Sequence, residues 1–278
     1  MARKQRISIN EQKHIIKLYE YGISTIKIGE MYGLSSSTIA YYLYKQGVKL
    51  RDNSINSRLF TVNHNYFEKI DSDDKAYWLG FMYADGYVAS KSNQVGLTIS
   101  KKDINHLEKF RSCLDCNYPI HTYRFYGYSK GNEYCRFIVT SRKLKDDLIK
   151  QGCIKNKTNV LSAPIIREDL IPDFIRGYID GDGCIAFTHI KGYPDWRVKI
   201  CGTIDILDFI KKYIEENDLA IIRRYYERKP GQIVKTLELT GNNRVKKFLE
   251  LIYKDSTVFL ERKYNKYIEL VNYNSRAK

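Results

Sequence analysis

The hydrophobic and polar positions at the start of the chain follow the period of short helices. Apolar residues recur three and four positions apart in stretches that glycines interrupt. Ser8–Glu11 has the capping-box pattern and predicts a helix that continues to about Tyr21. Ser24 and Ser35 precede the next two stretches, and serine is a preferred N-cap residue. The pattern therefore predicts a small all-helical domain over residues 1–50.

Within this domain, a short helix, a glycine-containing turn and a second helix match a helix-turn-helix unit. The segment Tyr21–Ile39 resembles the helix-turn-helix units of transposases and resolvases. Its expected core is Ile28, Leu34, Ile39 and Leu43. The last helix would enter the major groove, and its expected DNA-reading residues are Ser36, Ser37, Tyr41, Tyr42 and Lys45. A helical interaction domain that makes no DNA contact is the alternative.

Residues 51–66 have little apolar periodicity. Arg51 and Arg58 stand there among asparagines and serines. Such a composition predicts a basic linker that lies along phosphates rather than folding by itself, with Arg51 as a candidate DNA contact.

From residue 67 onward the pattern repeats with a period of roughly 100 residues. Trp78–Gly86 and Ile175–Gly183 are both apolar helical stretches that end in an acid followed by glycine. The same order of elements follows each copy, which predicts an α+β fold with two pseudo-symmetric αββαββα halves, 67–165 and 166–278. Strands are expected over 87–91, 94–100, 121–127, 134–140, 184–190, 196–201, 221–227 and 232–239, with a turn at 192–194. Helices are expected between and after them over 103–114, 142–151, 204–214 and 243–253.

The repeated helical stretches carry small residues four positions apart, which lie on one helix face. These residues are Gly80 and Ala84 in the first copy, and Gly177 and Gly181 in the second. Glycine inside a helix costs about 1 kcal/mol relative to alanine. We therefore expect the two helices to approach each other closely through these faces. Gly86 and Gly183 are expected in the left-handed conformation that ends a helix.

The acids of the two stretches, Asp85 and Asp182, fall at the helix C-termini, where the helix dipole is negative. If the helices pack side by side, two carboxylates share one negative site, and a divalent cation would neutralise it. Oxygen ligands of this kind favour Mg²⁺. Two unrelated core helices with ordinary ends are the alternative, which the presence of two matching copies disfavours.

The composition points to a polyanionic partner. The 278 residues include 47 lysines and arginines against 32 acids, a net charge of +15. No apolar stretch approaches the length of a membrane span, and the basic start lacks the apolar region of a signal peptide. We therefore expect a nucleic-acid partner and a cytoplasmic location, with an organelle as an alternative. Cys113 and Cys116 lack a second ligand pair, so reduced thiols are expected rather than a zinc site.

The repeated stretch resembles the LAGLIDADG motif of homing endonucleases. The first copy keeps Gly80, Ala84, Asp85 and Gly86, and the second keeps Gly177, Ile179, Asp180, Asp182 and Gly183. Tyr83 departs from the family, because an acid that is not the metal-binding one often stands at this position. The resemblance covers roughly residues 67–278.

This resemblance implies a monomeric, site-specific endonuclease that cuts double-stranded DNA with Mg²⁺ held by Asp85 and Asp182. It also implies a basic residue near each metal, matched here by Lys157 and Lys263, with Lys155 and Arg262 as alternatives. The sheets would form a saddle on the DNA, and the alternation along 196–200 places Trp196, Val198 and Ile200 in the core. The candidate DNA contacts on the strands are Gln94, Thr98, Arg124, Arg136, Arg197, Lys199, Arg223, Arg224 and Arg228. A DNA-binding transcriptional regulator and a maturase that binds intron RNA are the alternatives on the same fold.

Overall fold

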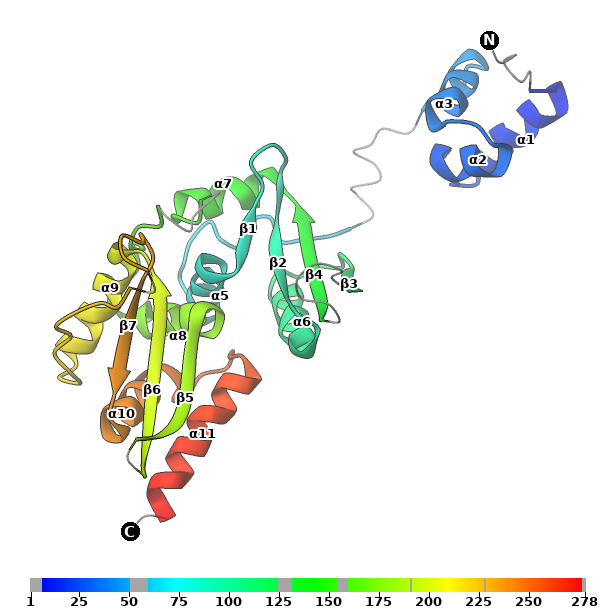
Figure 1. Ribbon diagram of the computed structural model, residues 1–278. Coiled ribbons are helices and arrows are strands. Elements are labelled where there is room, and N and C mark those ends of the chain that lie inside the picture. Colours follow the sequence, from blue (N-terminus) through cyan, green and yellow to red (C-terminus); the bar gives the residue numbers. More distant parts are fainter. Residues whose placement is uncertain are drawn as a thin grey trace. The chain divides into compact units, whose positions relative to one another are not determined.

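The computed structural model describes residues 7–50, 60–124, 132–154, 160–190, 192–227 and 229–276. The chain divides into two compact units, Met1–Leu59 and Phe60–Lys278, and each is described by itself (Figure 1). Their boundary lies inside the stretch that the sequence predicts to be a linker.

The first unit contains α1 (Ile9–Glu20), α2 (Thr25–Tyr32) and α3 (Ser36–Lys45). Ser8 begins α1 with the predicted capping box: its side chain accepts from the Glu11 amide, and the Glu11 carboxylate accepts from the Ser8 amide at 2.7 Å. Ser24 and Ser35 cap the other two helices. The core consists of Ile15, Tyr19, Ile28, Ile39 and Leu43, with Leu34 partly buried against it. The three predicted helices are confirmed.

The second unit is built on two antiparallel sheets. The first has the strand order β1-β2-β4-β3, and the second has the order β5-β6-β7. Their strands are β1 (Gly86–Val88), β2 (Gln94–Ser100), β3 (Ile120–Arg124), β4 (Glu133–Thr140), β5 (Gly183–Ile190), β6 (Tyr193–Gly202) and β7 (Lys235–Thr240). The helices are α5 (Asp73–Ala84), α6 (Ile104–Cys113), α7 (Arg142–Lys150), α8 (Ile171–Asp182), α9 (Ile204–Glu216), α10 (Asn242–Tyr253) and α11 (Glu261–Arg276). The predicted α+β class is confirmed.

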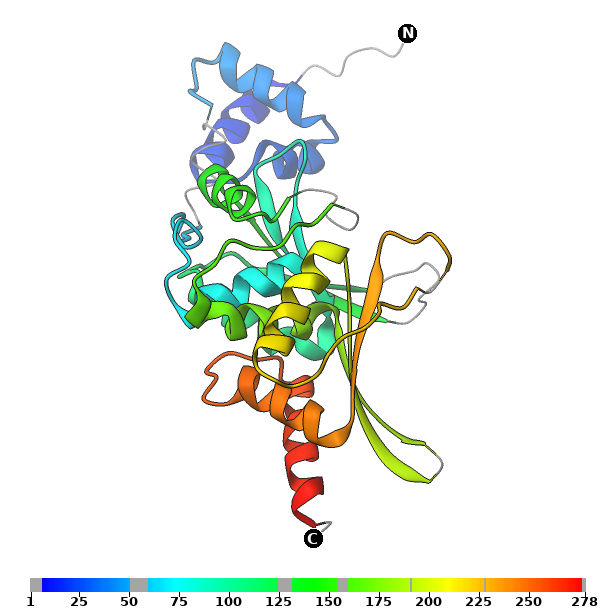
Figure 2. The same cartoon turned by 90° about the vertical axis from the view of Figure 1, so that its left-hand side faces the viewer.

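Each sheet is buried on one face and open on the other. Along β6, Trp196, Val198 and Ile200 are buried, whereas Arg197 and Lys199 between them are not. Successive side chains of a strand point to opposite faces, so the apolar residues pack against helices and the basic ones lie on the open face. Figure 2 shows α9 and α10 on one side of the sheet β5-β6-β7. In the described part of the chain, no helix is long and apolar enough to span a bilayer.

The predicted strand over 221–227 is wrong. Only Tyr226 pairs there, in an isolated bridge to Thr236, and β7 begins at Lys235. The amide of Ile222 donates instead to the Glu215 side chain at 2.9 Å, and Ile222 is buried. The segment therefore follows α9 as an irregular chain that one isoleucine anchors.

The predicted turn at 192–194 is also wrong in part. Tyr193 pairs with Ile190 and Pro194 pairs with His189, so both already belong to β6. Proline is tolerated near the first residue of a strand, where few ladder hydrogen bonds depend on it.

Gly86 and Gly183 do not adopt the predicted left-handed conformation. Gly183 is extended, with φ −89° and ψ 163°, and both glycines begin strands that follow the helices directly. A Cβ atom at Gly86 would lie 2.3 Å from the Met82 carbonyl oxygen, and one at Gly183 would lie 2.6 Å from that of Ile179. Glycine is therefore required by close contact with the last helical turn, and not by its φ angle.

Candidate functional site

The site lies where α5 and α8 pack together. A Cβ atom on Gly80 would lie 2.1 Å from the carbonyl oxygen of Phe174, and one on Gly177 would lie 1.9 Å from that of Tyr77. A Cβ on Gly181 would lie 2.2 Å from the Cβ of Ala84. Any side chain at these glycines would push the backbones apart, so the two helices touch through their main chains.

The contacts run in the same order along both helices, so α5 and α8 are parallel and end at the same edge of the interface. Asp85 is the C-cap of α5, and Asp182 is the last residue of α8. The Cβ position of Gly181 lies 3.5 Å from Oδ2 of Asp85, so this carboxylate faces the last turn of the other helix. Asp182 borders a cavity of about 200 Å³ that is also lined by Tyr83, Ala84, Tyr178, Cys201, Gly202 and Thr203.

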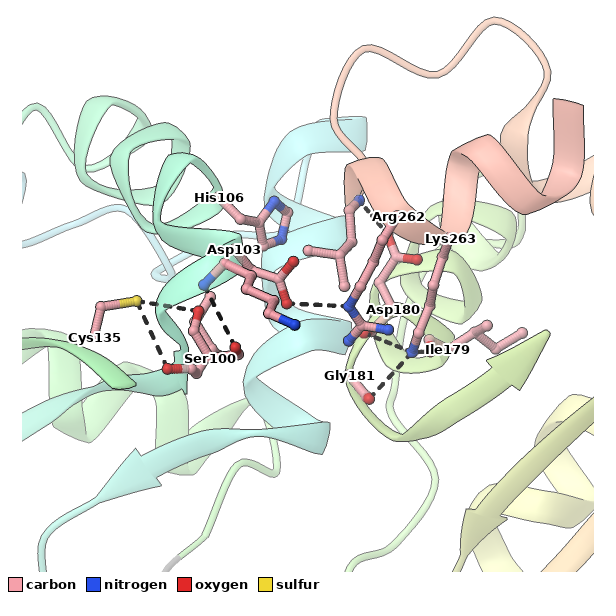
Figure 3. A network of polar contacts seen from close by, with 12 residues as sticks. Ser100, Asp103, His106, Cys135, Ile179, Asp180, Gly181, Arg262 and Lys263 are labelled. Atoms are coloured by element: carbon pink, nitrogen blue, oxygen red, sulfur yellow. Dashed lines mark hydrogen bonds and ion pairs between the residues drawn. The ribbon is translucent and has the colours of Figure 1, made fainter. Parts of the chain in front are cut away.

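Lys263, in the first turn of α11, caps the end of α8. Its Nζ donates to the carbonyl oxygens of Ile179 at 2.5 Å, Asp180 at 2.8 Å and Gly181 at 3.2 Å (Figure 3). The Ile179 carbonyl also accepts from the Gly183 amide, whereas Asp180 and Gly181 belong to the last turn, whose carbonyls an α-helix leaves without internal partners. Burial lowers the pKa of Lys263 to about 8, while the charges of Asp180, Asp85 and Asp182 oppose this shift. A buried ammonium thus offsets the negative pole at which the two acids stand.

The carboxylate of Asp180 is fully buried beside this lysine. It accepts hydrogen bonds from the Tyr77 hydroxyl at 2.7 Å, the Tyr253 hydroxyl at 2.6 Å and the Leu260 amide at 2.7 Å. Burial raises the pKa of Asp180, and these hydrogen bonds and the charge of Lys263 oppose the shift. The sequence identifies Asp180 only as an acid of the motif that does not bind metal. Its buried hydrogen-bond network could not be predicted, because the partners lie far away in the chain.

Further contacts tie the start of α11 to the first half. Arg262 donates from Nε to Asp103 at 3.1 Å, and Lys109 donates to Glu261 at 2.7 Å. Figure 3 shows Arg262 extending from α11 to Asp103 while Lys263 points to the end of α8. The first turn of α11 therefore contacts both halves.

The corresponding end of α5 is held by neutral groups. The Tyr83 hydroxyl donates to the carbonyl of Gln151 at 2.6 Å, and Cys153 Sγ donates to that of Met82 at 3.3 Å. Gly152 has φ 91°, and a Cβ there would lie 2.0 Å from the Tyr83 hydroxyl. The tyrosine that departs from the family pattern is thus accommodated by a glycine.

The remaining residues predicted on the strands fall into two groups by position. Thr98 and Arg136 are register partners on the open face of β2 and β4, where Gln94 also lies, and Arg197 and Lys199 occupy the open face of β6. Arg223 and Arg224 are exposed in the irregular segment before β7, and Arg124 is exposed at the end of β3 in an ion pair with Glu133.

In the first unit, Ser36, Ser37, Tyr41 and Lys45 are exposed on α3, and Tyr42 is half-buried. Lys157, Lys155, Arg51, Arg58 and Arg228 lie outside the described residues.

The donor chemistry of the site suits a hard divalent cation. Over the residues whose positions are described, no group of three or more histidine, cysteine or acidic side chains is placed to hold a metal ion. Asp85 and Asp182 nevertheless provide two carboxylates at adjacent helix ends. Mg²⁺ is commonly bound by one or two carboxylates, with water and substrate phosphate oxygens completing its shell. The residues present fit such an ion in the presence of a phosphate substrate.

No protein-family model matches the chain, and no functionally described protein matches its sequence. Among solved structures, it is similar to the LAGLIDADG meganuclease I-AabMI bound to uncleaved DNA, with 13% identity, a TM-score of 0.48 and coverage of 72% of this chain and 91% of that chain. It is similar to the LAGLIDADG homing endonuclease I-LtrWI bound to target DNA, with 13% identity, a TM-score of 0.47 and coverage of 77% and 92%. It is also similar to I-SmaMI bound to an uncleaved DNA target in the presence of calcium ions, with 13% identity, a TM-score of 0.45 and coverage of 71% and 89%.

Proposed function

We propose that this protein is a site-specific endonuclease that hydrolyses both strands of a DNA duplex with divalent metal ions bound at Asp85 and Asp182. The observation that carries the proposal is the parallel packing of α5 and α8, which brings both acids to one end of one interface. The motif resemblance of the two stretches supports the same assignment. Because both acids belong to one chain, a monomer would suffice to cut two strands.

Phosphodiester hydrolysis requires an activated water, neutralisation of phosphate charge and stabilisation of the leaving oxygen. Mg²⁺ bound by the two carboxylates would supply that neutralisation and lower the pKa of its bound water. Asp85 and Asp182 would hold the ions, while Lys263 keeps the end of α8 in place through its carbonyls. Lys263 also adds positive charge where negative charge develops on the phosphate.

The open sheet faces provide the surface for a duplex. They carry arginines, a lysine and small polar residues in a chain with a net charge of +15, which favours a polyanion. The three helices of the first unit would add a second DNA contact through the exposed residues of α3.

Selection followed by cleavage tests the proposal. Purified protein is incubated with a randomised duplex pool without Mg²⁺, the bound DNA is recovered, and the enriched sites are then exposed to protein with Mg²⁺ or with EDTA. We expect double-strand cleavage at a fixed position in the enriched site with Mg²⁺ and none with EDTA. Enriched sites that remain uncut with Mg²⁺ or Mn²⁺ would contradict the nuclease and favour the regulator. Selection of structured RNA over DNA would favour the maturase.

A further inference from the structure

The open face of the sheet β5-β6-β7 carries a charged cluster at its centre. Arg197 lies on β6, the middle strand, and its register partners are Ala186 on β5 and Thr240 on β7. Cross-strand partners share a face, so the Arg197 side chain stands between two small neighbours. Its guanidinium is therefore the largest group of its row on this face.

Two carboxylates hold this guanidinium. Arg197 Nε donates to Asp195 Oδ2, and its Nη1 donates to Glu238 Oε1 at 2.8 Å. The side chains of Asp195 and Glu238 are 19% and 12% exposed, against 26% for Arg197. Both acids are therefore less exposed than the arginine, and their hydrogen bonds to Nε and Nη1 fix the guanidinium plane. The guanidinium has more N–H donors than these two bonds use, so donors stay available above the sheet.

The cluster carries no net positive charge. Lys199 Nζ lies 3.6 Å from the same Glu238 oxygen, so two bases are balanced by two acids. A phosphate contact depends on positive charge that replaces counterions, and adjacent carboxylates would weaken it. Reading a guanine edge depends instead on a planar donor pair at a fixed angle, which held carboxylates provide. The arrangement around Arg197 suits a base edge better than a phosphate.

The other sheet offers a matched contrast. Arg136 lies on an interior strand, β4, and its register partners are Thr98 and His121. It is exposed, and among the described residues it forms no ion pair with a carboxylate. An arginine with that freedom and unbalanced charge suits a phosphate, and it provides the control for Arg197.

We propose that Arg197 reads a guanine in the DNA target and that Asp195 and Glu238 are its positioning residues. This inference rests on the proposed function, because it requires a duplex on the open sheet face. Ala186, the partner of Arg197, follows Asp182 by four residues on β5, about 13 Å of strand. The guanine is therefore expected within about four base pairs of the cleaved bonds, given a rise of about 3.4 Å per base pair.

The test compares base preferences of full-length variants in a randomised duplex pool, in buffer with calcium, followed by sequencing of the bound DNA. Arg197→Lys keeps the charge and removes the planar donor pair. We expect it to reduce the guanine preference at one position by on the order of 10-fold, with the preferences elsewhere and the salt dependence unchanged. The double variant Asp195→Asn/Glu238→Gln should lower the same preference while it strengthens binding to all sequences. Arg136→Lys should leave that preference intact.

Three outcomes would overturn the inference. Uniformly weaker binding by Arg197→Lys would assign Arg197 to a phosphate. A guanine preference that survives in the Asp195→Asn/Glu238→Gln variant would remove the positioning role. A lower melting temperature without any change in base preference would make the cluster a stabiliser of the sheet. Failure of the wild-type protein to enrich any DNA sequence would instead contradict the proposed function itself, before any variant is compared.

Discussion

The ends of α5 and α8 occupy equivalent places in the two halves, yet they are completed by different chemistry. The carbonyl of Met82 in α5 accepts from the neutral thiol of Cys153, whereas that of Ile179 in α8 accepts from the buried ammonium of Lys263. A thiol is a weak donor, and an ammonium makes stronger, charge-assisted hydrogen bonds. The two helix ends thus have the same backbone arrangement, but a positive charge lies beside the end of α8 and a neutral group beside the end of α5.

The residue two positions before each acid is also neutral in the first half and acidic in the second. Tyr83 donates one hydrogen bond to a carbonyl, whereas Asp180 accepts three from groups in α5, α10 and the loop before α11. The end of α8 therefore belongs to a buried charged network that reaches into both halves, and the end of α5 has no such network among the described residues.

Replacing Asp180 by asparagine should have the largest effect on stability. The change leaves three buried donors, Tyr77, Tyr253 and the Leu260 amide, with a single acceptor oxygen, and it removes the charge that most favours the buried Lys263 ammonium. The expected loss in the free energy of unfolding is about 3–5 kcal/mol. The matched change in the first half, Tyr83→Phe, removes one hydrogen bond and should cost about 1 kcal/mol. Urea denaturation measures both. Equal losses would contradict the asymmetry between the halves.

Replacing Lys263 by methionine should come next. The end of α8 would lose three charge-assisted hydrogen bonds, and only the Ile179 carbonyl would keep another donor, the Gly183 amide. The expected loss is about 3 kcal/mol in the free energy of unfolding. Cys153→Ala, the counterpart at α5, should cost about 1 kcal/mol. A Lys263 variant as stable as the Cys153 variant would show that the charged cap adds nothing over the thiol.

A pH-dependent loss of stability is expected from His106, whose Nε2 lies 3.0 Å from the Tyr77 hydroxyl that donates to Asp180. Burial lowers the pKa of His106 to about 3 from 6.5. Between these values the unfolded chain binds a proton at His106 that the folded protein does not. The contribution of the neutral imidazole to the free energy of unfolding is therefore complete above pH 6.5 and is lost as the pH falls. The loss at pH 5 is about 2 kcal/mol. His106→Gln should remove that part of the difference in the free energy of unfolding between pH 7 and pH 5. An unchanged difference in this variant would refute the role of His106.

The smallest effect is expected at the ion pair between Arg262 and Asp103. The arginine side chain is 56% exposed, and pairs in contact with water contribute less than about 1 kcal/mol. A double-mutant cycle with Arg262→Gln and Asp103→Asn measures their coupling. A coupling as large as the loss in the Asp180 variant would show that this pair, and not the buried network, joins the halves.

The sequence predicts the features that repeat within it. Gly80 and Gly177 stand out because glycine is unfavourable inside a helix, and their spacing from Asp85 and Asp182 predicts the helix pair that the structure contains. The alternation along β6 likewise assigns Trp196 and Arg197 to opposite faces, as observed.

Features that depend on partners far away in the chain could not be predicted. The network of Asp180 needs Tyr253 and Leu260, and no periodicity connects these positions. The strand expected over 221–227 has apolar residues at suitable spacing, but the Ile222 amide donates to the side chain of Glu215 and not to a neighbouring strand. A local pattern specifies an element only where no group outside that pattern competes for its hydrogen bonds.

We propose above that Asp85 and Asp182 form one centre for cutting both strands. The most direct test of this proposal is cleavage of a supercoiled plasmid that carries the selected site, with wild-type protein, Asp85→Asn and Asp182→Asn at matched DNA occupancy in Mg²⁺. We expect linear product from the wild type and none from either variant, although both variants bind the site with affinities close to that of the wild type. Linear product at the wild-type rate from either variant would contradict the proposal.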